Sequence, residues 1–219
     1  MEQTSTCVVV SGGGPVDPSV LDHLPQSALV IGVDSGVADA IDLGLHVDVA
    51  VGDFDSLPTD ILASVVASGA RVERHPVAKD ATDLELGLLA AARRGAARVV
   101  VVGGDGGRLD HLLGNALLLA APRFADLVVE AHLGPAWVGV ARPGAATGVA
   151  GRPGDTVSLL PVGGAATGVV TTGLAYGLAG EELTAGTTRG ISNELTCSRA
   201  TVSLRCGALL VVRPGQADR

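Results

Sequence analysis

Short apolar runs rich in valine alternate with longer amphipathic stretches through the first 131 residues. The runs are CVVVSGGG, ALVIGVDSG, VDVAVGDFDS, ARVVVVGGDGG and ADLVVEAHL, with GARVERHP as a weaker example. Helix-like stretches lie between them, including residues 83–94 and 110–121. Continuous apolar runs bounded by turns are typical of strands covered on both faces, so the pattern predicts a parallel sheet with helices on each side.

The helical period disappears after about residue 133. Stretches such as DTVSLLPVGG, ATGVVTTGLAYGL and ATVSLRCGALLVVRPG follow, and glycine and proline interrupt them at intervals typical of a sandwich. We interpret the Gly- and Pro-rich segment 142–155 as a loop. The fold class predicted is therefore α/β, with a Rossmann-like domain over residues 1–132 whose sheet carries helices on both faces, followed by an all-β sandwich domain over residues 133–219.

Composition narrows the classes of function. Of 219 residues, 47% are hydrophobic but only 2% aromatic, so valine, leucine and alanine must build the core. A net charge of −8 and a pI near 5.0 argue against a nucleic-acid partner. No run approaches the ~20 apolar residues that span a bilayer, and the start MEQTSTCVVV lacks the pattern of a signal peptide. We therefore expect a cytoplasmic protein without a membrane partner.

Acidic residues fall where predicted strands end. Asp34 follows LVIGV, Asp53 and Asp55 follow VDVAV, and Asp105 follows RVVVV. Open α/β sheets bind ligands beyond these ends. If the extended strand persists, Asp53 and Asp55 face one point, where a Mg2+ ion would relieve their repulsion. An aspartate-rich surface turn explains the same letters equally well.

The segment KDATDLELGL adds a helix start to this picture. Thr82 and Glu85 have capping-box spacing, so Thr82 is the expected N-cap and Asp83 the first helical residue. Asp83 either stabilises the helix dipole or completes a metal site with the two earlier aspartates. Lys79, just upstream, is a candidate phosphate contact.

The segment VVGGDGGRLDHLLGN predicts a strand, a glycine-rich loop and a helix. Such a loop exposes backbone N–H groups to an anion, and Arg108 can grip phosphate oxygens in a fork. Neither the P-loop pattern nor the dinucleotide pattern fits here or at SGGGP, residues 11–15. The predicted phosphate site is therefore of a different kind.

Seven segments together resemble the thiamine pyrophosphokinase family, almost along the whole chain and in the order of that family. They are VDSG (33–36), GDFDS (52–56), KDATDLELGL (79–88), GGRLDHLLGN (106–115), VSLLPV (157–162), GLAYGL (173–178) and GISNELT (190–196). The resemblance implies that the hydroxyl of thiamine attacks ATP, with magnesium present, to give thiamine diphosphate and AMP. It also implies a homodimer whose active site is shared between subunits.

The resemblance also implies roles for individual residues. The expected metal ligands are Asp53, Asp55 and Asp83, which form the catalytic set together with Arg108 and Asp110, the latter our candidate general base. The expected nucleotide-binding residues are Asp34, Lys79, Thr82, Gly106, Gly107 and Arg108. The expected thiamine-binding residues are Tyr176, Ser192 and Asn193.

Two departures from the family concern substrate recognition. DSGVAD (34–39) stands where the family has DGGAN, and GLAYGL lacks the basic residue often found after its first two letters. One alternative is a diphosphokinase of the same fold that acts on a pterin or a pyrimidine carbinol. Another is a nucleotide-binding regulator without catalysis, although retention of all three expected metal ligands argues against it.

Overall fold

The computed structural model describes residues 5–77 and 80–215, which fall into two compact units. The first comprises Met1–Leu118 and Asp126–Gly134, and the second Leu119–Ala125 and Pro135–Arg219. Helices and a large sheet confirm the mixed α/β class. A membrane-spanning helix was not found within the described ranges.

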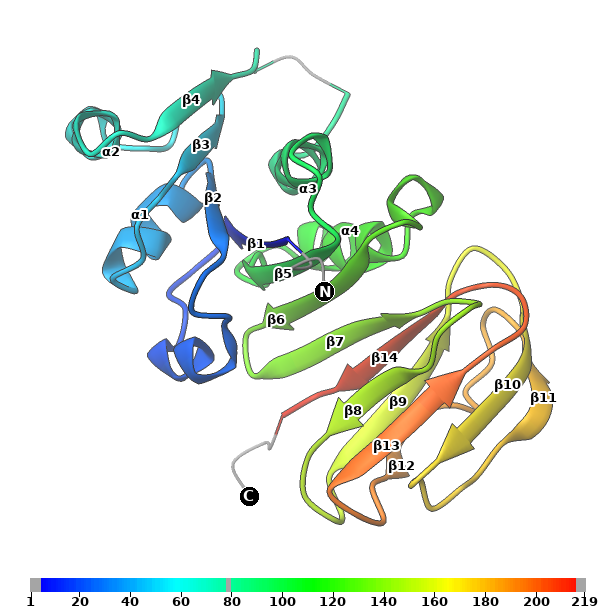
Figure 1. Ribbon diagram of the computed structural model, residues 1–219. Coiled ribbons are helices and arrows are strands. Elements are labelled where there is room, and N and C mark those ends of the chain that lie inside the picture. The colour runs from blue at the N-terminus through cyan, green and yellow to red at the C-terminus, as the bar shows by residue number, and fades with distance from the viewer. Residues whose placement is uncertain (1–4, 78–79, 216–219) are drawn as a thin grey trace. The chain divides into compact units, whose positions relative to one another are not determined.

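The first unit contains a parallel sheet of six described strands (Figure 1). They are β1 (Thr6–Ser11), β2 (Leu29–Val33), β3 (Val49–Gly52), β4 (Arg71–Arg74), β5 (Arg98–Gly103) and β6 (Val128–Leu133). Their order is β6-β5-β1-β2-β3-β4, and each neighbouring pair is parallel. Each apolar run expected to be a strand in the first 131 residues is one.

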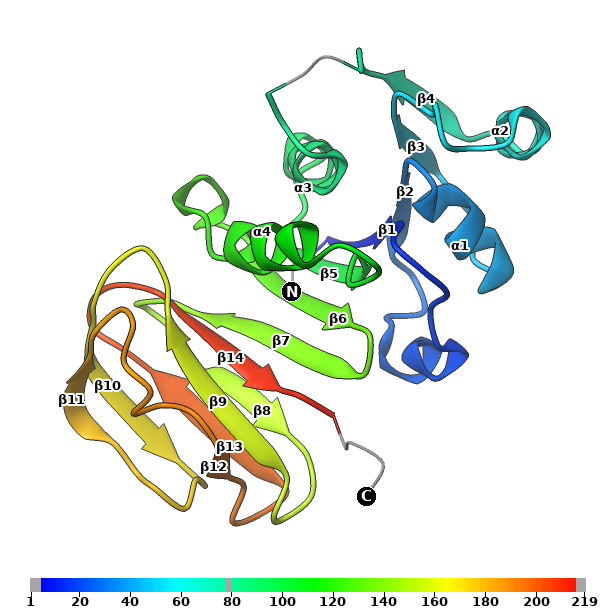
Figure 2. The same cartoon turned by 180° about the vertical axis from the view of Figure 1, so that it is seen from behind.

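Helices cover both faces of this sheet (Figures 1 and 2). They are α1 (Gly36–Asp42), α2 (Thr59–Ala67), α3 (Asp83–Arg93) and α4 (Leu109–Leu119), besides the short 3-10 helix η1 (Pro18–His23). Val8 and Val10 of β1 pack in one cluster with Val37 of α1. Val9, which points to the other face, lies against Gly87 of α3. The helices α1 and α3 therefore lie on opposite faces.

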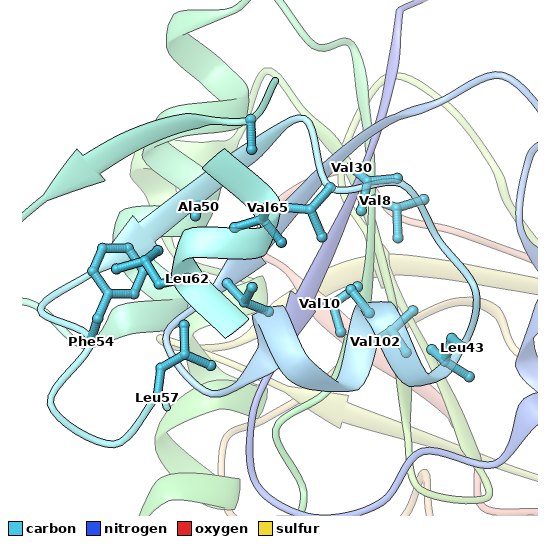
Figure 3. Packing of buried hydrophobic residues seen from close by; sticks show 14 of the residues in the cluster. Val8, Val10, Val30, Leu43, Ala50, Phe54, Leu57, Leu62, Val65 and Val102 are labelled. Carbon is cyan, nitrogen blue, oxygen red and sulfur yellow. The ribbon is translucent and has the colours of Figure 1, made fainter. Parts of the chain in front are cut away.

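The core under α1 and α2 is almost entirely aliphatic (Figure 3). Strand side chains such as Val8, Val30 and Val102 belong to one cluster with Leu62 and Val65 of α2, and Phe54 lies at one end of this cluster. Small, branched side chains let the helices approach the sheet closely. Composition had predicted such a core.

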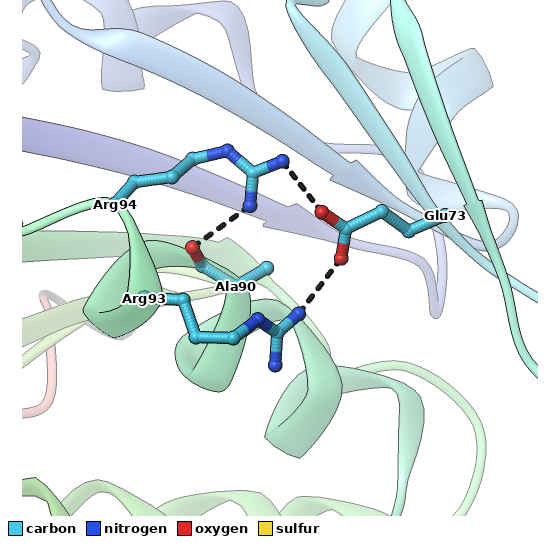
Figure 4. Close-up of polar contacts among 4 residues, drawn as sticks. All are labelled: Glu73, Ala90, Arg93 and Arg94. Atoms are coloured by element: carbon cyan, nitrogen blue, oxygen red, sulfur yellow. Dashed lines mark hydrogen bonds and ion pairs between the residues drawn. The ribbon is translucent and has the colours of Figure 1, made fainter.

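An ion-pair network anchors the end of α3 to the edge of the sheet (Figure 4). Glu73 of β4 accepts hydrogen bonds from Arg93 at 2.7 Å and from Arg94 at 2.6 Å. Arg94 also donates to the carbonyl of Ala90, 3.0 Å away. Because α3 begins at Asp83, this anchor helps to fix the helix that carries a candidate site residue.

The second unit consists of two antiparallel sheets. Its elements are the 3-10 helix η2 (Pro122–Phe124) and the strands β7 (Ala136–Ala141), β8 (Thr147–Ala150), β9 (Thr156–Pro161), β10 (Ala166–Thr172), β11 (Ala179–Leu183), β12 (Asn193–Glu194), β13 (Arg199–Ser203) and β14 (Leu209–Arg213). The orders are β12-β9-β14-β7 and β11-β10-β13-β8. Side chains from both sheets, such as Leu159 and Val202, share one core cluster.

One expectation for this unit was wrong. Segment 142–155, interpreted as a loop, contains β8, which pairs with β13. Val149 is the only buried residue among the four of β8.

The order of the strands in the first unit defines where a ligand belongs. From β1 the chain builds β2, β3 and β4 outward on one side, and then returns to place β5 on the other side of β1. The carboxyl ends of β1 and β5 therefore form a topological switch point, where α/β sheets bind ligands.

Candidate functional site

Three carboxylates converge at the carboxyl edge of the parallel sheet. Asp34 follows β2, and Asp53 and Asp55 follow β3, the strand beside it. One oxygen from each lies within 4.8 Å of the others. Asp34 and Asp53 are half-buried and Asp55 is exposed. The structure thus brings together three aspartates that the sequence placed at two separate strand ends.

Unusual backbone conformations shape this cluster. Within the part of the chain that the structure describes, three non-glycine residues have positive φ: Asp34 (49°), Phe54 (63°) and Ser192 (57°). Such conformations cost about 1–3 kcal/mol each and persist where the surroundings fix them. The extended geometry expected through residues 53–55 is wrong, because β3 ends at Gly52 and Phe54 turns the chain.

Hydrogen bonds tie the two acidic loops together. The N–H of Phe54 donates to Oδ1 of Asp34 at 3.1 Å, and the hydroxyl of Ser56 donates to Oδ2 of Asp34 at 2.6 Å. The ring of Phe54 is buried, and the Arg74 guanidinium lies 5.2 Å from its centroid. Asp34 therefore fixes the position of the loop that carries Asp53 and Asp55.

Repulsion within the cluster affects protonation. The charge of Asp53 raises the pKa of Asp55 above its ordinary value, and desolvation and the charge of Asp34 add to the effect. Asp83 contributes in the same direction. A divalent cation among these oxygens would relieve the repulsion, and carboxylate oxygens are the ligands that Mg2+ prefers. The donor set fits this ion.

Helix α3 begins as the sequence predicts. Thr82 is the N-cap, and its hydroxyl accepts a hydrogen bond from the N–H of Glu85 at 3.3 Å. Asp83 is the first helical residue, but it is not one of the three carboxylates grouped within 4.8 Å. Lys79 lies outside the described residues.

The loop after β5 presents glycine backbone and a charged pair. Gly106 and Gly107 lead into α4, and Gly107 has a φ of 75°. Arg108 holds both oxygens of the Asp110 carboxylate, with Nε–Oδ1 at 3.1 Å and Nη2–Oδ2 at 2.6 Å. These hydrogen bonds lower the pKa of Asp110 to about 2. Asp110 is therefore ionised and weakly basic while Arg108 holds it.

Asn115 supports the candidate site through the loop after β5, and it was not among the residues predicted for the site. It is buried in α4, and its Nδ2 donates to the carbonyl of Gly104 at 2.9 Å. This hydrogen bond holds the glycine loop, residues 104–107, against α4. The available signal was a single amide side chain inside the apolar stretch HLLGNALLLAA.

The residues expected to bind thiamine lie together in the second unit. Asn193 is buried, accepts a hydrogen bond from the N–H of Tyr176 at 2.9 Å and donates to the carbonyl of Tyr176 at 2.8 Å. The ring of Tyr176 is left exposed. Ser192, in its left-handed conformation, donates its N–H to the hydroxyl of Ser158 at 3.1 Å. The amide of Asn193 therefore fixes the backbone that presents the tyrosine.

A parallel sheet with carboxylates and a glycine loop beyond its strand ends is the arrangement of a nucleotide-binding α/β enzyme. Comparisons with known proteins define the family. The family model of the thiamin pyrophosphokinase catalytic domain matches residues 21–130, and that of its vitamin B1 binding domain matches residues 149–209. The chain belongs to the thiamin pyrophosphokinase family.

Similar proteins agree over nearly the full length of the chain. Thiamine pyrophosphokinase of Bacillus subtilis (strain 168) is 29% identical over 206 residues, which cover 93% of this chain and 96% of that protein. The crystal structure of the Bacillus subtilis enzyme covers 97% of this chain and 100% of its own, with a TM-score of 0.84. That of the Geobacillus thermodenitrificans enzyme, 31% identical, gives 0.81 with 97% and 99% covered. The predicted family, and with it an enzyme of the thiamine diphosphokinase class, is confirmed.

Proposed function

We propose that the chain transfers the diphosphoryl group of ATP to the hydroxyl of thiamine, giving thiamine diphosphate and AMP. In this proposal a Rossmann-like domain over residues 1–132 holds nucleotide and metal, and a β-sandwich domain over residues 133–219 holds thiamine. Family membership supports the reaction. The observation that carries the site is the convergence of Asp34, Asp53 and Asp55 at the carboxyl edge of the sheet.

We assign Mg2+ to Asp53 and Asp55. Both carboxylates lie on the loop that Asp34 fixes, and the family resemblance adds Asp83 from the start of α3. Bound there, the ion would neutralise phosphate charge, which dominates catalysis in phosphoryl transfer. Asp34 itself uses both oxygens on neighbouring protein groups, so we assign it to positioning the acidic loop beside the nucleotide.

Arg108 and Asp110 have linked roles in this proposal. A guanidinium binds phosphate oxygens through the same fork with which it binds a carboxylate. When Arg108 turns to the nucleotide, Asp110 loses the partner that lowers its pKa and becomes a better acceptor for the thiamine hydroxyl proton. The proposal further assigns nucleotide contacts to Lys79, Thr82, Gly106 and Gly107.

The second unit supplies the acceptor site. An exposed aromatic ring on a rigid backbone offers a flat apolar face for a heteroaromatic substrate, and Tyr176 is held in this way by Asn193. Ser192 lies beside it on a fixed turn. Following the resemblance, we also propose a cytoplasmic homodimer with its active site at the subunit interface, which light scattering and mixed-variant complementation can test.

The direct test incubates the protein with ATP, Mg2+ and thiamine, and separates the products. We expect AMP and thiamine diphosphate in equal amounts, and loss of most turnover in Asp53→Asn. Asp126 is an exposed aspartate just before β6, at the amino ends of the strands and away from the acidic cluster. Asp126→Asn is therefore the matched control and should retain wild-type turnover. ADP as the product, or diphosphorylation of a pterin or pyrimidine carbinol in preference to thiamine, would contradict the assignment.

A further inference from the structure

The loop Ser11–Gly14, which follows β1, matches neither common nucleotide fingerprint. It nevertheless occupies the centre of the carboxyl edge, because β1 lies between β2 and β5. We call it the β1 loop. On one side of it lies the loop after β2, which carries Asp34 and which we call the acidic loop here, and on the other side lies the glycine loop after β5.

The β1 loop touches the acidic loop through backbone. A Cβ added at Gly12 would lie 1.8 Å from Oγ of Ser35 and 3.1 Å from the backbone N of Gly36, and one added at Gly36 would lie 2.8 Å from the backbone N of Gly12. A Cβ at Gly36 would also lie 2.3 Å from the carbonyl oxygen of Val10, so no side chain fits at that position. The two loops are therefore as close as main chains allow, directly beside Asp34.

The β1 loop touches the glycine loop in the same way. A Cβ at Gly106 would lie 1.1 Å from the carbonyl oxygen of Gly13, and one at Gly103 would lie 2.4 Å from that of Ser11. Asn115 braces the far side of the glycine loop through Gly104. The β1 loop is thus the physical link between the acidic cluster and the expected phosphate site.

This link exposes backbone donors. Gly13 and Gly14 are both exposed, with φ of 143° and 141°. Among hydrogen bonds between described residues, none uses the N–H of Gly13, Gly14, Gly106 or Gly107 as its donor. Adjacent free N–H groups next to the start of a helix form a concavity suited to an anion.

We propose that the β1 loop is the second wall of the phosphate site and donates the N–H groups of Gly13 and Gly14 to the polyphosphate chain of the nucleotide. The inference rests on the proposed function for the identity of the ligand. It explains how a chain with a net charge of −8 holds a polyanion: neutral donors at the switch point contact the phosphates, while the carboxylates contact only the cation. A polyphosphate lying along this edge passes from the glycine loop over β1 toward Asp53 and Asp55.

A charge placed on the β1 loop tests the inference. Gly14→Asp sets a carboxylate beside the proposed phosphates, and Gly14→Asn has the same shape without the charge. Gly69→Asp is the matched control, since both glycines have positive φ and the nearest atom to an added Cβ is 3.9 Å away at Gly14 and beyond 4 Å at Gly69. Gly69 lies between α2 and β4, at the other edge of the sheet.

The measurement is the Kd of α,β-methylene ATP with Mg2+, by calorimetry, together with KM for ATP and for thiamine. We expect Gly14→Asp to weaken nucleotide binding about tenfold, as two like charges within a few ångströms do, with the KM for thiamine unchanged. Gly14→Asn should lie between it and the wild type, and Gly69→Asp within twofold of wild type. Unchanged Kd and KM for ATP in Gly14→Asp would overturn the inference while leaving the proposed function intact.

Two further results separate the inference from the proposed function. The wild-type protein could make no thiamine diphosphate while Gly14→Asp binds inorganic pyrophosphate less well than the wild type does. That pair of results would refute the proposed reaction and support the phosphate site at the β1 loop. If the variant does not fold, 15N-glycine-labelled wild-type protein titrated with pyrophosphate gives the answer. The amide resonances of Gly13 and Gly14 should then shift while that of Gly69 stays in place, and unmoved resonances at saturation would overturn the inference.

Discussion

Close contact between α3 and the sheet makes Gly87 a sensitive position. A Cβ added there would lie 2.6 Å from Cγ2 of Val33 and 2.9 Å from Cγ1 of Val9. Both valines are almost fully buried, and a β-branched side chain has little rotameric freedom. Neither can swing aside, so in Gly87→Ala the helix must move away from the sheet.

The magnitude follows from two opposing effects. Alanine in place of glycine inside a helix favours folding by about 1 kcal/mol. Overpacking a well-filled core costs about 1–3 kcal/mol. Gly114→Ala in α4 isolates the first effect, because nothing apart from neighbouring residues and the backbone of α4 itself lies within 4 Å of the added Cβ. We expect Gly114→Ala to be about 1 kcal/mol more stable than wild type, and Gly87→Ala to be about 1–3 kcal/mol less stable than Gly114→Ala.

Urea denaturation followed by circular dichroism at 222 nm measures the difference. The helical signal reports the first unit, because α1, α2, α3 and nearly all of α4 lie within it. Adding Val33→Ala to Gly87→Ala removes the nearer of the two methyl groups that clash, so the double variant should lose at least about 1 kcal/mol less than the sum of the single losses. Equal stabilisation by Gly87→Ala and Gly114→Ala would show that α3 has room over the sheet and that the predicted clash does not occur.

Two further predictions concern charged groups. Burial alone raises the pKa of Glu73, but the hydrogen bonds and charges of Arg94 and Arg93 outweigh burial and leave the pKa below its ordinary value. The stabilisation from Glu73 is therefore present above the pKa of the unfolded state and is lost as the pH falls through the pKa of the folded state. Glu73→Gln should therefore lower the free energy of unfolding by about 1 kcal/mol at pH 7 and make that free energy fall less steeply in acid. Urea titrations at several pH values measure both effects. An unchanged slope of the free energy of unfolding against pH would exclude this network as a source of acid sensitivity. Arg108→Lys removes the fork that lowers the pKa of Asp110 in the free enzyme, so the acid limb of kcat/KM against pH should move to higher pH. A limb that stays in place would exclude Asp110 as the base.

Much of the fold could be predicted because its signals are local. Each valine run of the first unit is bounded by turn residues, and the N-cap at Thr82 uses only residues within one helical turn. Strand β8 shows the limit. Gly148 and Ala150 are exposed and Val149 alone is fully buried, so four residues of a Gly-rich segment carry too little alternation to predict a strand. Pairing with β13, far along the chain, is what makes it one.

The site was predictable in its residue types but not in its contacts. Strand ends indicate where Asp34 and Asp53 lie along the chain, whereas their meeting depends on β2 and β3 being neighbours in the sheet. The left-handed turn at Phe54 has no local sequence signal, since phenylalanine rarely adopts it and the hydrogen bond to Asp34 holds it. The position of the β1 loop could not be predicted for the same reason, because its contacts with Ser35 and Gly106 are visible only in three dimensions.

The proposed metal site predicts that the carboxylate of Asp55 has opposite effects on nucleotide binding with and without Mg2+. With Mg2+ bound, Asp55 supports the cation that attracts phosphate, so Asp55→Asn should weaken nucleotide binding. With Mg2+ chelated, the same carboxylate only repels a polyanion, so Asp55→Asn should tighten binding by about three- to tenfold, the effect of one charge a few ångströms away in water. Calorimetry with α,β-methylene ATP in Mg2+ and in EDTA measures both Kd values, with Asp126→Asn as the control that should change neither. A change in the same direction under both conditions would mean that Asp55 acts on the nucleotide without a cation, and the assignment of the metal to this cluster would be wrong.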